Sequence, residues 1–273
     1  MSQKYTERYA KSFDQLRRNS QGAFVPFVML GDPDLESCYE IIVTLIENGA
    51  DALELGIPFS DPIADGPVIQ KAAIRALKNG ATVARCFDLI AKVRQSYPQV
   101  PIGLLVYSNL VVGNSIDGFY QQAAIAGVDS VLVADVPTIE AEVFVETAEK
   151  YGIAPIFIAT PNANEETIKR IAQLSKGYTY LLSRAGVTGT EVKAEMPLGQ
   201  ILSALEKYSA PPTLLGFGIS EPAQVSAAIN NGAFGAISGS AVVKIIEDQL
   251  NNRSHMTEKL AEFVRGMKLA TQK

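Results

Sequence analysis

The sequence predicts an α/β fold, a single (β/α)8 barrel with an extra N-terminal helix. Short apolar runs alternate with amphipathic helical segments from end to end, and no linker or low-complexity run divides them. Eight such units fit into the 273 residues, at about 30 residues for each βα repeat. We therefore expect residues 1–273 to form one domain. An open, doubly wound sheet is the alternative.

The strands are predicted from eight apolar runs. Several are apolar at nearly every residue, as parallel strands covered on both faces are. They are Phe24–Leu30, Ala52–Ile57, Ile102–Tyr107, Ser130–Asp135, Ala154–Ala159, Tyr178–Ser183, Thr213–Phe217 and Gly235–Ser238.

The helices are predicted from apolar spacing and from residues that favour helix starts. Leu35–Asn48 repeats apolar residues at helical spacing behind Asp34, and Thr82–Ser96 and Val242–Glu247 are further helices. Other starts are predicted at Thr138, Asn164 and Ser220. An N-terminal helix with Tyr5, Tyr9, Phe13 and Leu16 on one stripe is expected to cover the bottom of the barrel.

Composition excludes several classes of protein. The net charge of -5 and the pI near 5.1 argue against nucleic-acid binding, which needs a basic surplus. The N-terminus lacks the apolar core of a secretory signal, and no apolar run approaches the roughly 18 residues that span a bilayer. Cys38 and Cys86 fit small buried side chains in a reducing compartment. These features predict a soluble cytoplasmic protein.

The single histidine, His255, lies in a charged segment near the C-terminus. Ser-His-Asp and Cys-His catalysis need a histidine in the site, and zinc or iron sites usually need two or more. We therefore expect no metal. The predicted strands contain no lysine, which argues against a Schiff-base aldolase.

Glu54 is the most informative residue, because it interrupts an apolar strand. Strand alternation puts Ala52, Glu54 and Gly56 on one face, and this small face suits the barrel lumen. A buried ion pair is the alternative interpretation, but only Arg184 offers a cation beside a strand. Burial without a cation predicts a raised pKa, which suits general acid–base catalysis.

Two further carboxylates, Asp61 and Asp65, lie in the Pro58–Pro67 loop that follows. Both precede turn residues, so a rigid solvated turn is one interpretation and a catalytic loop that adds a second carboxylate is the other. Asp135 ends the fourth predicted strand, where a structural role is as reasonable as a functional one.

Glycine-rich turns follow the last two strands, at Leu215–Ser220 and Ala236–Ala241. In barrels these positions recurrently bind phosphate, because backbone N–H groups at helix starts attract a dianion. Tight packing is the alternative reason for these glycines, and Glu221 is expected to point away. The Gly/Thr-rich stretch after strand six, up to Pro197, is expected to be a mobile lid. Tyr178 and Tyr180 share a strand face, where core packing is the simpler role.

These residues favour proton transfer by carboxylates on a phosphorylated small molecule. The reaction could be an isomerisation or a carbon–carbon cleavage.

The motifs narrow this choice by resemblance. Leu53-Glu54-Leu55-Gly56-Ile57-Pro58-Phe59-Ser60-Asp61-Pro62 with Ala64-Asp65-Gly66-Pro67 resembles the signature of the tryptophan synthase alpha subunit family. The likeness extends through Gly31-Asp32-Pro33, Tyr180–Arg184, Gly186–Gly189, Gly216–Ser220 and Gly239-Ser240. It implies retro-aldol cleavage of indole-3-glycerol phosphate to indole and glyceraldehyde 3-phosphate.

The resemblance also implies residue roles. Glu54 would shuttle the proton, and Asp65 would accept a hydrogen bond from the indole N–H. Tyr180 would help to position the substrate and Glu54, and Thr188 would belong to the closing lid. The indole pocket would comprise Phe27, Leu105 and Leu132, and the phosphate site Gly189, Gly218, Gly239 and Ser240.

The family works with a beta subunit in an α2β2 complex, and the beta subunit holds pyridoxal phosphate. The resemblance therefore implies that partner, with the Pro58–Asp65 loop near it, and no cofactor on this chain. Another phosphosugar barrel enzyme and a catalytically inactive regulatory subunit are the competing interpretations.

Overall fold

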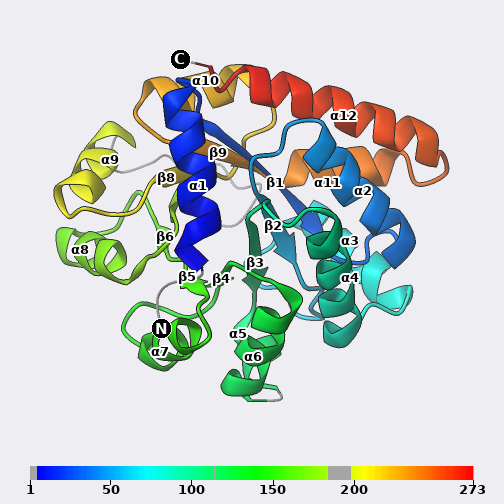
Figure 1. Ribbon diagram of the computed structural model, residues 1–273, viewed down its shortest axis with the longest axis horizontal. Coiled ribbons are helices and arrows are strands. Elements are labelled where there is room, and N and C mark those ends of the chain that lie inside the picture. The colour runs from blue at the N-terminus through cyan, green and yellow to red at the C-terminus, as the bar shows by residue number, and fades with distance from the viewer. Residues whose placement is uncertain (1–4, 114, 184–197, 273) are drawn as a thin grey trace.

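The structure, a computed structural model, describes residues 5–113, 115–183 and 198–272. Parallel strands form a ring with helices outside it (Figure 1). The strands are β1 (Ala23–Met29), β2 (Leu53–Gly56), β3 (Ile102–Val106), β4 (Ser130–Val133), β5 (Ala154–Pro155), β6 (Ile158–Ala159), β7 (Thr179–Leu182), β8 (Thr213–Gly216) and β9 (Gly235–Ser238).

The predicted fifth strand is observed as two short pieces, and this segment closes the barrel. Its first half, β5, pairs with β4, and its second half, β6, pairs with β7. Between them, the Ile156 N–H donates to Val131 O at 3.0 Å and the Tyr180 N–H to Phe157 O at 3.1 Å. The two pieces together occupy the position of one strand between β4 and β7, and the predicted (β/α)8 barrel is confirmed.

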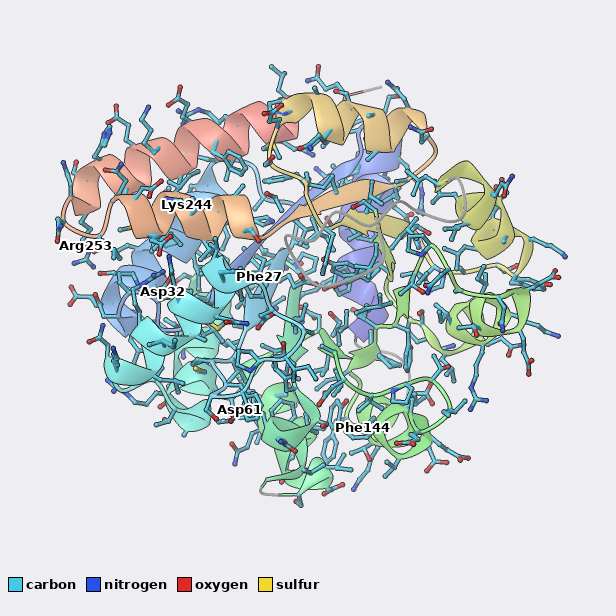
Figure 2. All side chains as sticks on the ribbon, turned by 180° about the vertical axis from the view of Figure 1, so that it is seen from behind. Phe27, Asp32, Asp61, Phe144, Lys244 and Arg253 are labelled. Carbon is cyan, nitrogen blue, oxygen red and sulfur yellow. The ribbon has the colours of Figure 1, made fainter. Side chains whose placement is uncertain are left out.

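The helices surround this ring. They are α1 (Tyr5–Arg18), α2 (Leu35–Glu47), α3 (Pro67–Lys78), α4 (Val83–Ser96), α5 (Ser108–Val112), α6 (Ile116–Ala126), α7 (Glu142–Lys150), α8 (Glu165–Leu174), α9 (Leu198–Lys207), α10 (Pro222–Asn230), α11 (Ser240–Asp248) and α12 (Arg253–Leu269). Figure 2 shows the ring from the side opposite to α1, with Phe27 labelled near the mouth.

Local side-chain chemistry explains most helix starts. The side chains of Asp34, Thr82 and Asn164 accept hydrogen bonds from the first turns of α2, α4 and α8, as predicted. The start predicted at Thr138 is wrong, because α7 begins after Ala141. The start predicted at Ser220 is off by one residue, since α10 has Glu221 as its N-cap.

The N-terminal helix α1 lies across one end of the ring, as expected (Figure 1). Its residues Tyr9, Phe13 and Leu16 are buried in the cluster that fills the barrel interior. Arg8, which is not part of this cluster, joins α1 to the residue that precedes β4: its Nη1 donates to Asp129 Oδ1 at 2.7 Å. Asp129 also accepts from Arg94 Nη2 at 2.7 Å, so a partly buried ion-pair network around one buried carboxylate closes this end of the barrel.

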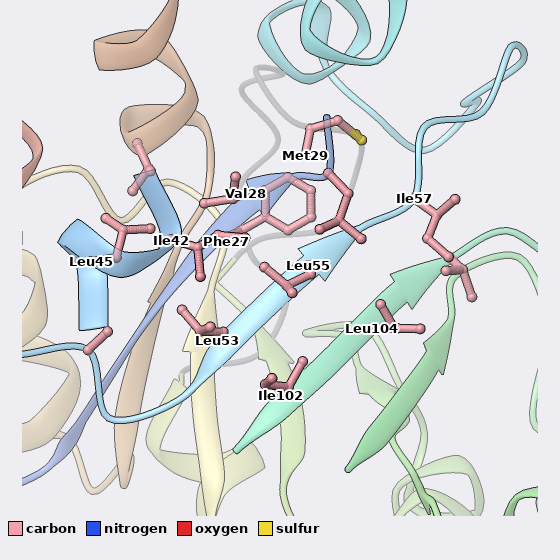
Figure 3. Close-up of a cluster of buried hydrophobic side chains, with 14 of the residues drawn as sticks. Phe27, Val28, Met29, Ile42, Leu45, Leu53, Leu55, Ile57, Ile102 and Leu104 are labelled. Atoms are coloured by element: carbon pink, nitrogen blue, oxygen red, sulfur yellow. The ribbon is translucent and has the colours of Figure 1, made fainter. Parts of the chain in front are cut away.

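The main apolar core lies between the strands and the helices. Leu53, Leu55 and Ile57 belong to it and are buried together with Ile42 and Leu45 of α2 (Figure 3). This leaves the alternate residues of β2, including Glu54, for the lumen, as the alternation predicts. Among the residues that the structure describes, no helix is long and apolar enough to cross a membrane.

Candidate active site

A cavity of about 280 Å³ opens at the carboxyl ends of the strands. Barrel enzymes place their active sites there. Of the predicted site residues, it brings together Phe27, Glu54, Asp65, Leu105, Tyr180, Gly218, Gly239 and Ser240. Leu132 does not line it and is buried in the barrel interior cluster. Thr188 and Gly189, with the rest of the predicted lid, lie outside the described residues.

Glu54 lies in the lumen with only 2% of its surface exposed. Burial raises the pKa of its carboxyl from 4.5 to about 7. The Tyr178 hydroxyl, which donates to Glu54 Oε1 at 3.0 Å, partly opposes this rise. Within the described ranges, no cation forms a salt bridge with Glu54. Arg184, the cation on which the alternative of a buried ion pair depends, lies outside these ranges. A carboxyl with a pKa near 7 can both give and take a proton at neutral pH.

The hydroxyl that contacts Glu54 is that of Tyr178, whereas the resemblance gives the positioning of Glu54 to Tyr180 and the sequence favours core packing for Tyr178. The available signal was alternation. Tyr178 and Tyr180 share a strand face, and that face is the lumen into which Glu54 also points.

Asp65 is the carboxylate that the loop adds to the cavity. It is half-buried, and burial raises its pKa to about 6, against the effect of the Tyr107 hydroxyl. The loop is fastened to β3 through Tyr107: its hydroxyl accepts from the Ala64 N–H at 3.1 Å, and its ring stacks on Phe59 at 5.4 Å. Asp65 is therefore held in place before any ligand binds.

The other two acids that the sequence analysis considered lie elsewhere. Asp61 is exposed and does not line the cavity. Asp135 accepts hydrogen bonds at 2.7 Å from both the backbone N–H and the hydroxyl of Ser108, at the start of α5. Asp61 thus fits the solvated turn, and Asp135 has a structural role.

The turns after β8 and β9 form the opposite wall. Gly218 (φ +73°) adopts the left-handed conformation that favours glycine, and Ser238 Oγ ties the two turns together by donating to Ile219 O at 2.6 Å. Gly239 is the N-cap of α11 and has no side chain to occupy the N–H groups of the first turn. These N–H groups are placed to bind an anion.

The neighbouring helix α10 offers less to an anion. Gln224 Oε1 accepts from the backbone N–H groups of Ser220 and Glu221 at 2.7 and 3.0 Å. Glu221 itself does not line the cavity, as expected. The charge of an anionic group would therefore be met chiefly at α11.

The arrangement combines two carboxyl groups of raised pKa, apolar walls and one helix N-terminus. Phe217, Ile219 and Ile237 add apolar surface that the sequence analysis did not single out. Such a cavity suits a molecule with a flat apolar part and a phosphate, and acid–base chemistry between the two ends. In the described part of the chain, no group of three or more His, Cys, Asp or Glu residues is arranged to hold a metal ion.

Comparison with known proteins agrees with this geometry. The family model of the tryptophan synthase alpha chain matches residues 13–272. The alpha chain of Vibrio vulnificus (strain YJ016) is 61% identical over 267 residues, covering 98% of this chain and 100% of its own length. The alpha chain of Shewanella oneidensis is 60% identical over 264 residues, covering 97% and 95%.

Solved structures extend the likeness to the whole fold. The tryptophan synthase alpha subunit of Legionella pneumophila superposes with a TM-score of 0.86 at 29% identity, over 97% of this chain and 98% of that one. A chain from the tryptophan synthase α2β2 complex of Pyrococcus furiosus gives 0.80 at 35% identity, over 91% and 98%.

Proposed function

The chain belongs to the tryptophan synthase alpha chain family, and from this premise we propose that Glu54 and Asp65 are the catalytic pair of its reaction. That reaction is the retro-aldol cleavage of indole-3-glycerol phosphate to indole and glyceraldehyde 3-phosphate. The observation that carries the assignment is the position of two carboxyl groups with pKa values of about 7 and about 6 in one cavity.

The chemistry assigns different tasks to the two acids. Glu54 gives a proton to C3 of the indole ring, which turns the ring into a leaving group, and helps to take the proton from the glycerol hydroxyl. The bond between C3 and the glycerol carbon then breaks, and its electrons return to the ring as the carbonyl forms. Asp65 accepts a hydrogen bond from the indole N–H and stabilises the positive charge that develops on the ring.

The remaining predicted residues orient the substrate. Phe27 and Leu105 contribute apolar surface around the indole, and Tyr180 lines the same cavity from β7. Gly239 and Ser240, at the start of α11, bind the phosphate together with Gly218 of the turn after β8. For Leu132, Thr188 and Gly189 the support is the family resemblance alone.

We also propose a beta subunit as the partner, in an α2β2 assembly that uses the released indole to make L-tryptophan. Support comes from the Pyrococcus furiosus relative, which was solved as an α2β2 complex. Ile63, at the tip of the loop that carries Asp65, is 79% exposed and offers apolar surface to such a partner. No cofactor is proposed for this chain.

Cytoplasmic location and folding as one domain are two further proposals. Cys38 and Cys86 are free, buried thiols, which suits a reducing compartment. Packing of both α1 and α12 on the same barrel favours a single folding unit.

The deciding experiment is an indole-release assay on indole-3-glycerol phosphate, with and without a beta subunit. We expect cleavage in both conditions. Release of indole in neither would contradict the assignment and favour a regulatory subunit that only binds a phosphorylated ligand.

A further inference from the structure

Three elements that border the cavity meet at one side chain, Arg75, near the end of α3. Its Nε and Nη2 donate to the two carboxylate oxygens of Asp32 at 2.8 and 2.9 Å. Its Nη1 lies 3.5 Å from Glu247 Oε1. Asp32 follows β1, which carries Phe27, and Glu247 is in the last turn of α11. One guanidinium therefore links the end of β1, α3 and α11.

The burial of this cluster makes it rigid. The side chain of Asp32 is 0% exposed, and those of Arg75 and Glu247 are each 19% exposed. A two-pronged contact between a guanidinium and a buried carboxylate fixes both groups in angle as well as in distance.

Lys71 offers an internal contrast. Its Nζ also reaches from α3 to α11, at 3.4 Å from Glu247 Oε1, but its side chain is 62% exposed. Solvent screens such a pair, and the lysine side chain keeps its freedom, so this contact constrains the two helices little.

Arg75 and Glu247 lie at similar distances from the starts of their helices. Helices α3 and α11 pack side by side, and Figure 2 shows them on the flank where Asp32 and Lys244 are labelled. Both begin at the cavity, at Pro67 and at Ser240. At about 1.5 Å per residue, Arg75 and Glu247 lie roughly 12 and 10 Å along their helices from these starts. The bidentate pair holds α3 to the segment after β1, and the single contact of 3.5 Å to Glu247 joins α11 to this anchor at matched depth. Together these contacts set how far one helix start stands from the other.

The two helix starts carry the two ends of the site. Asp65 immediately precedes α3, and the anion-binding first turn belongs to α11. We propose that Arg75 is a positioning residue that sets the separation between Asp65 and the phosphate-binding turn, through its simultaneous contacts with Asp32 and Glu247. This inference rests on the proposed function, since the substrate must have an indole at one end and a phosphate at the other.

The spacing matters only to a ligand that spans both ends. Indole alone, or inorganic phosphate alone, meets one helix start and is insensitive to the distance between them. Indole-3-glycerol phosphate has a fixed reach, so a small change in separation moves its reacting carbon away from Glu54. Misplacement by about 1 Å can cost up to roughly 10²-fold in rate.

Two variants test the proposal. Arg75→Lys keeps a positive charge beside Asp32 but cannot contact both oxygens and Glu247 together, and Glu247→Gln removes the charge on α11 while keeping the side-chain shape. We expect kcat/KM for indole-3-glycerol phosphate to fall roughly tenfold in each, with much of the loss in kcat. Dissociation constants of indole and of inorganic phosphate, measured separately by titration, should stay within about twofold of wild type.

The matched control is Lys71→Gln, which removes the exposed contact to the same carboxylate and should leave all three measurements unchanged. Wild-type cleavage in Arg75→Lys and in Glu247→Gln would overturn the inference. A parallel loss of cleavage and of both single-ligand affinities would also overturn it, because general loosening would then explain the effect. If Arg75→Lys does not fold, Glu247→Gln carries the test. Failure of the wild-type chain to cleave the substrate would instead contradict the proposed function.

Discussion

The Tyr178 hydroxyl donates a hydrogen bond to Glu54 Oε1 at 3.0 Å, and both side chains are buried. The hydroxyl stabilises the ionised carboxylate, while burial disfavours it and raises the pKa of Glu54 to about 7. The tyrosine therefore lowers the pKa of the proposed proton shuttle, Glu54, relative to burial alone. It also restricts the rotation of the Glu54 carboxyl group.

Replacing Tyr178 by Phe should raise the pKa of Glu54 further, because burial then acts unopposed. The limb of the pH–rate profile that Glu54 controls should move to higher pH, by roughly one to two units for a hydrogen bond to a charged group. Steady-state cleavage measured from pH 5 to 9 checks this. Tyr120→Phe, at another buried tyrosine that packs against Phe119, is the control and should leave the profile in place. An unchanged profile in Tyr178→Phe would contradict the tuning role.

Replacing Glu54 by Gln should abolish cleavage and yet stabilise the protein at alkaline pH. The pKa of Glu54 is about 7 in the folded protein and 4.5 as its ordinary value, so the folded state binds more protons between these pH values. The stability of the wild type therefore falls as pH rises through this window, and stays lower above pH 7.

The Glu54→Gln variant has no ionisable group at position 54, so it does not lose this stability as pH rises. Relative to wild type, its free energy of unfolding should rise by about 3 kcal/mol between pH 4 and pH 8. Urea unfolding at the two pH values measures the difference. The exposed Glu262→Gln on α12, which removes a carboxylate outside the cavity, serves as the reference. If the difference in unfolding free energy between Glu54→Gln and wild type were the same at both pH values, the pKa of Glu54 would be the same in the folded and the unfolded protein, and the prediction would be wrong.

Replacing Asp65 by Asn should remove the acidic limb of the profile. Its pKa is about 6, so the wild type loses the charged acceptor for the indole N–H as pH falls below that value. In Asp65→Asn we expect kcat/KM to drop by roughly 10²-fold and to vary little between pH 5 and 7. Asp61→Asn, in the same loop but exposed, should behave as wild type. Equal effects of the two substitutions would assign the loss to the loop rather than to the carboxylate.

The difference between Asp61 and Asp65 illustrates what the sequence could and could not predict. Both lie in one loop beside turn residues, and the contacts that hold this loop on Tyr107, distant in sequence, accompany the inward position of Asp65. By contrast, the orientation of Glu54 follows from strand alternation, and the N-caps at Asp34 and Thr82 follow from local side chains. Strand faces and helix starts can thus be predicted from residues that are close together in the sequence.

Contacts between distant residues carry no local signal. Arg75 and Asp32 are 43 residues apart, and no periodicity or motif pairs them. The same holds for the split of the fifth strand into β5 and β6, which depends on neighbours on both sides. The barrel and its acid were thus predictable, while the link between the two ends of the site required the structure.

Replacing Gly216 by Ala should disturb the site through Tyr180. A Cβ built on Gly216 would lie 2.2 Å from the Tyr180 hydroxyl oxygen and 2.4 and 2.5 Å from two ring carbons. The ring of Tyr180 is buried and has little room to move, so we expect a loss of about 1–3 kcal/mol in unfolding free energy from overpacking.

Removing the hydroxyl alone, in Gly216→Ala with Tyr180→Phe, should not restore the lost stability, because the ring carbons still clash. Tyr180→Leu in the same background should recover most of it. Gly199→Ala, where a Cβ meets nothing within 4 Å, is the control without a clash and should not destabilise, because alanine is favoured over glycine within helix α9. Urea unfolding of the four variants checks the argument, and full recovery with Tyr180→Phe would contradict it.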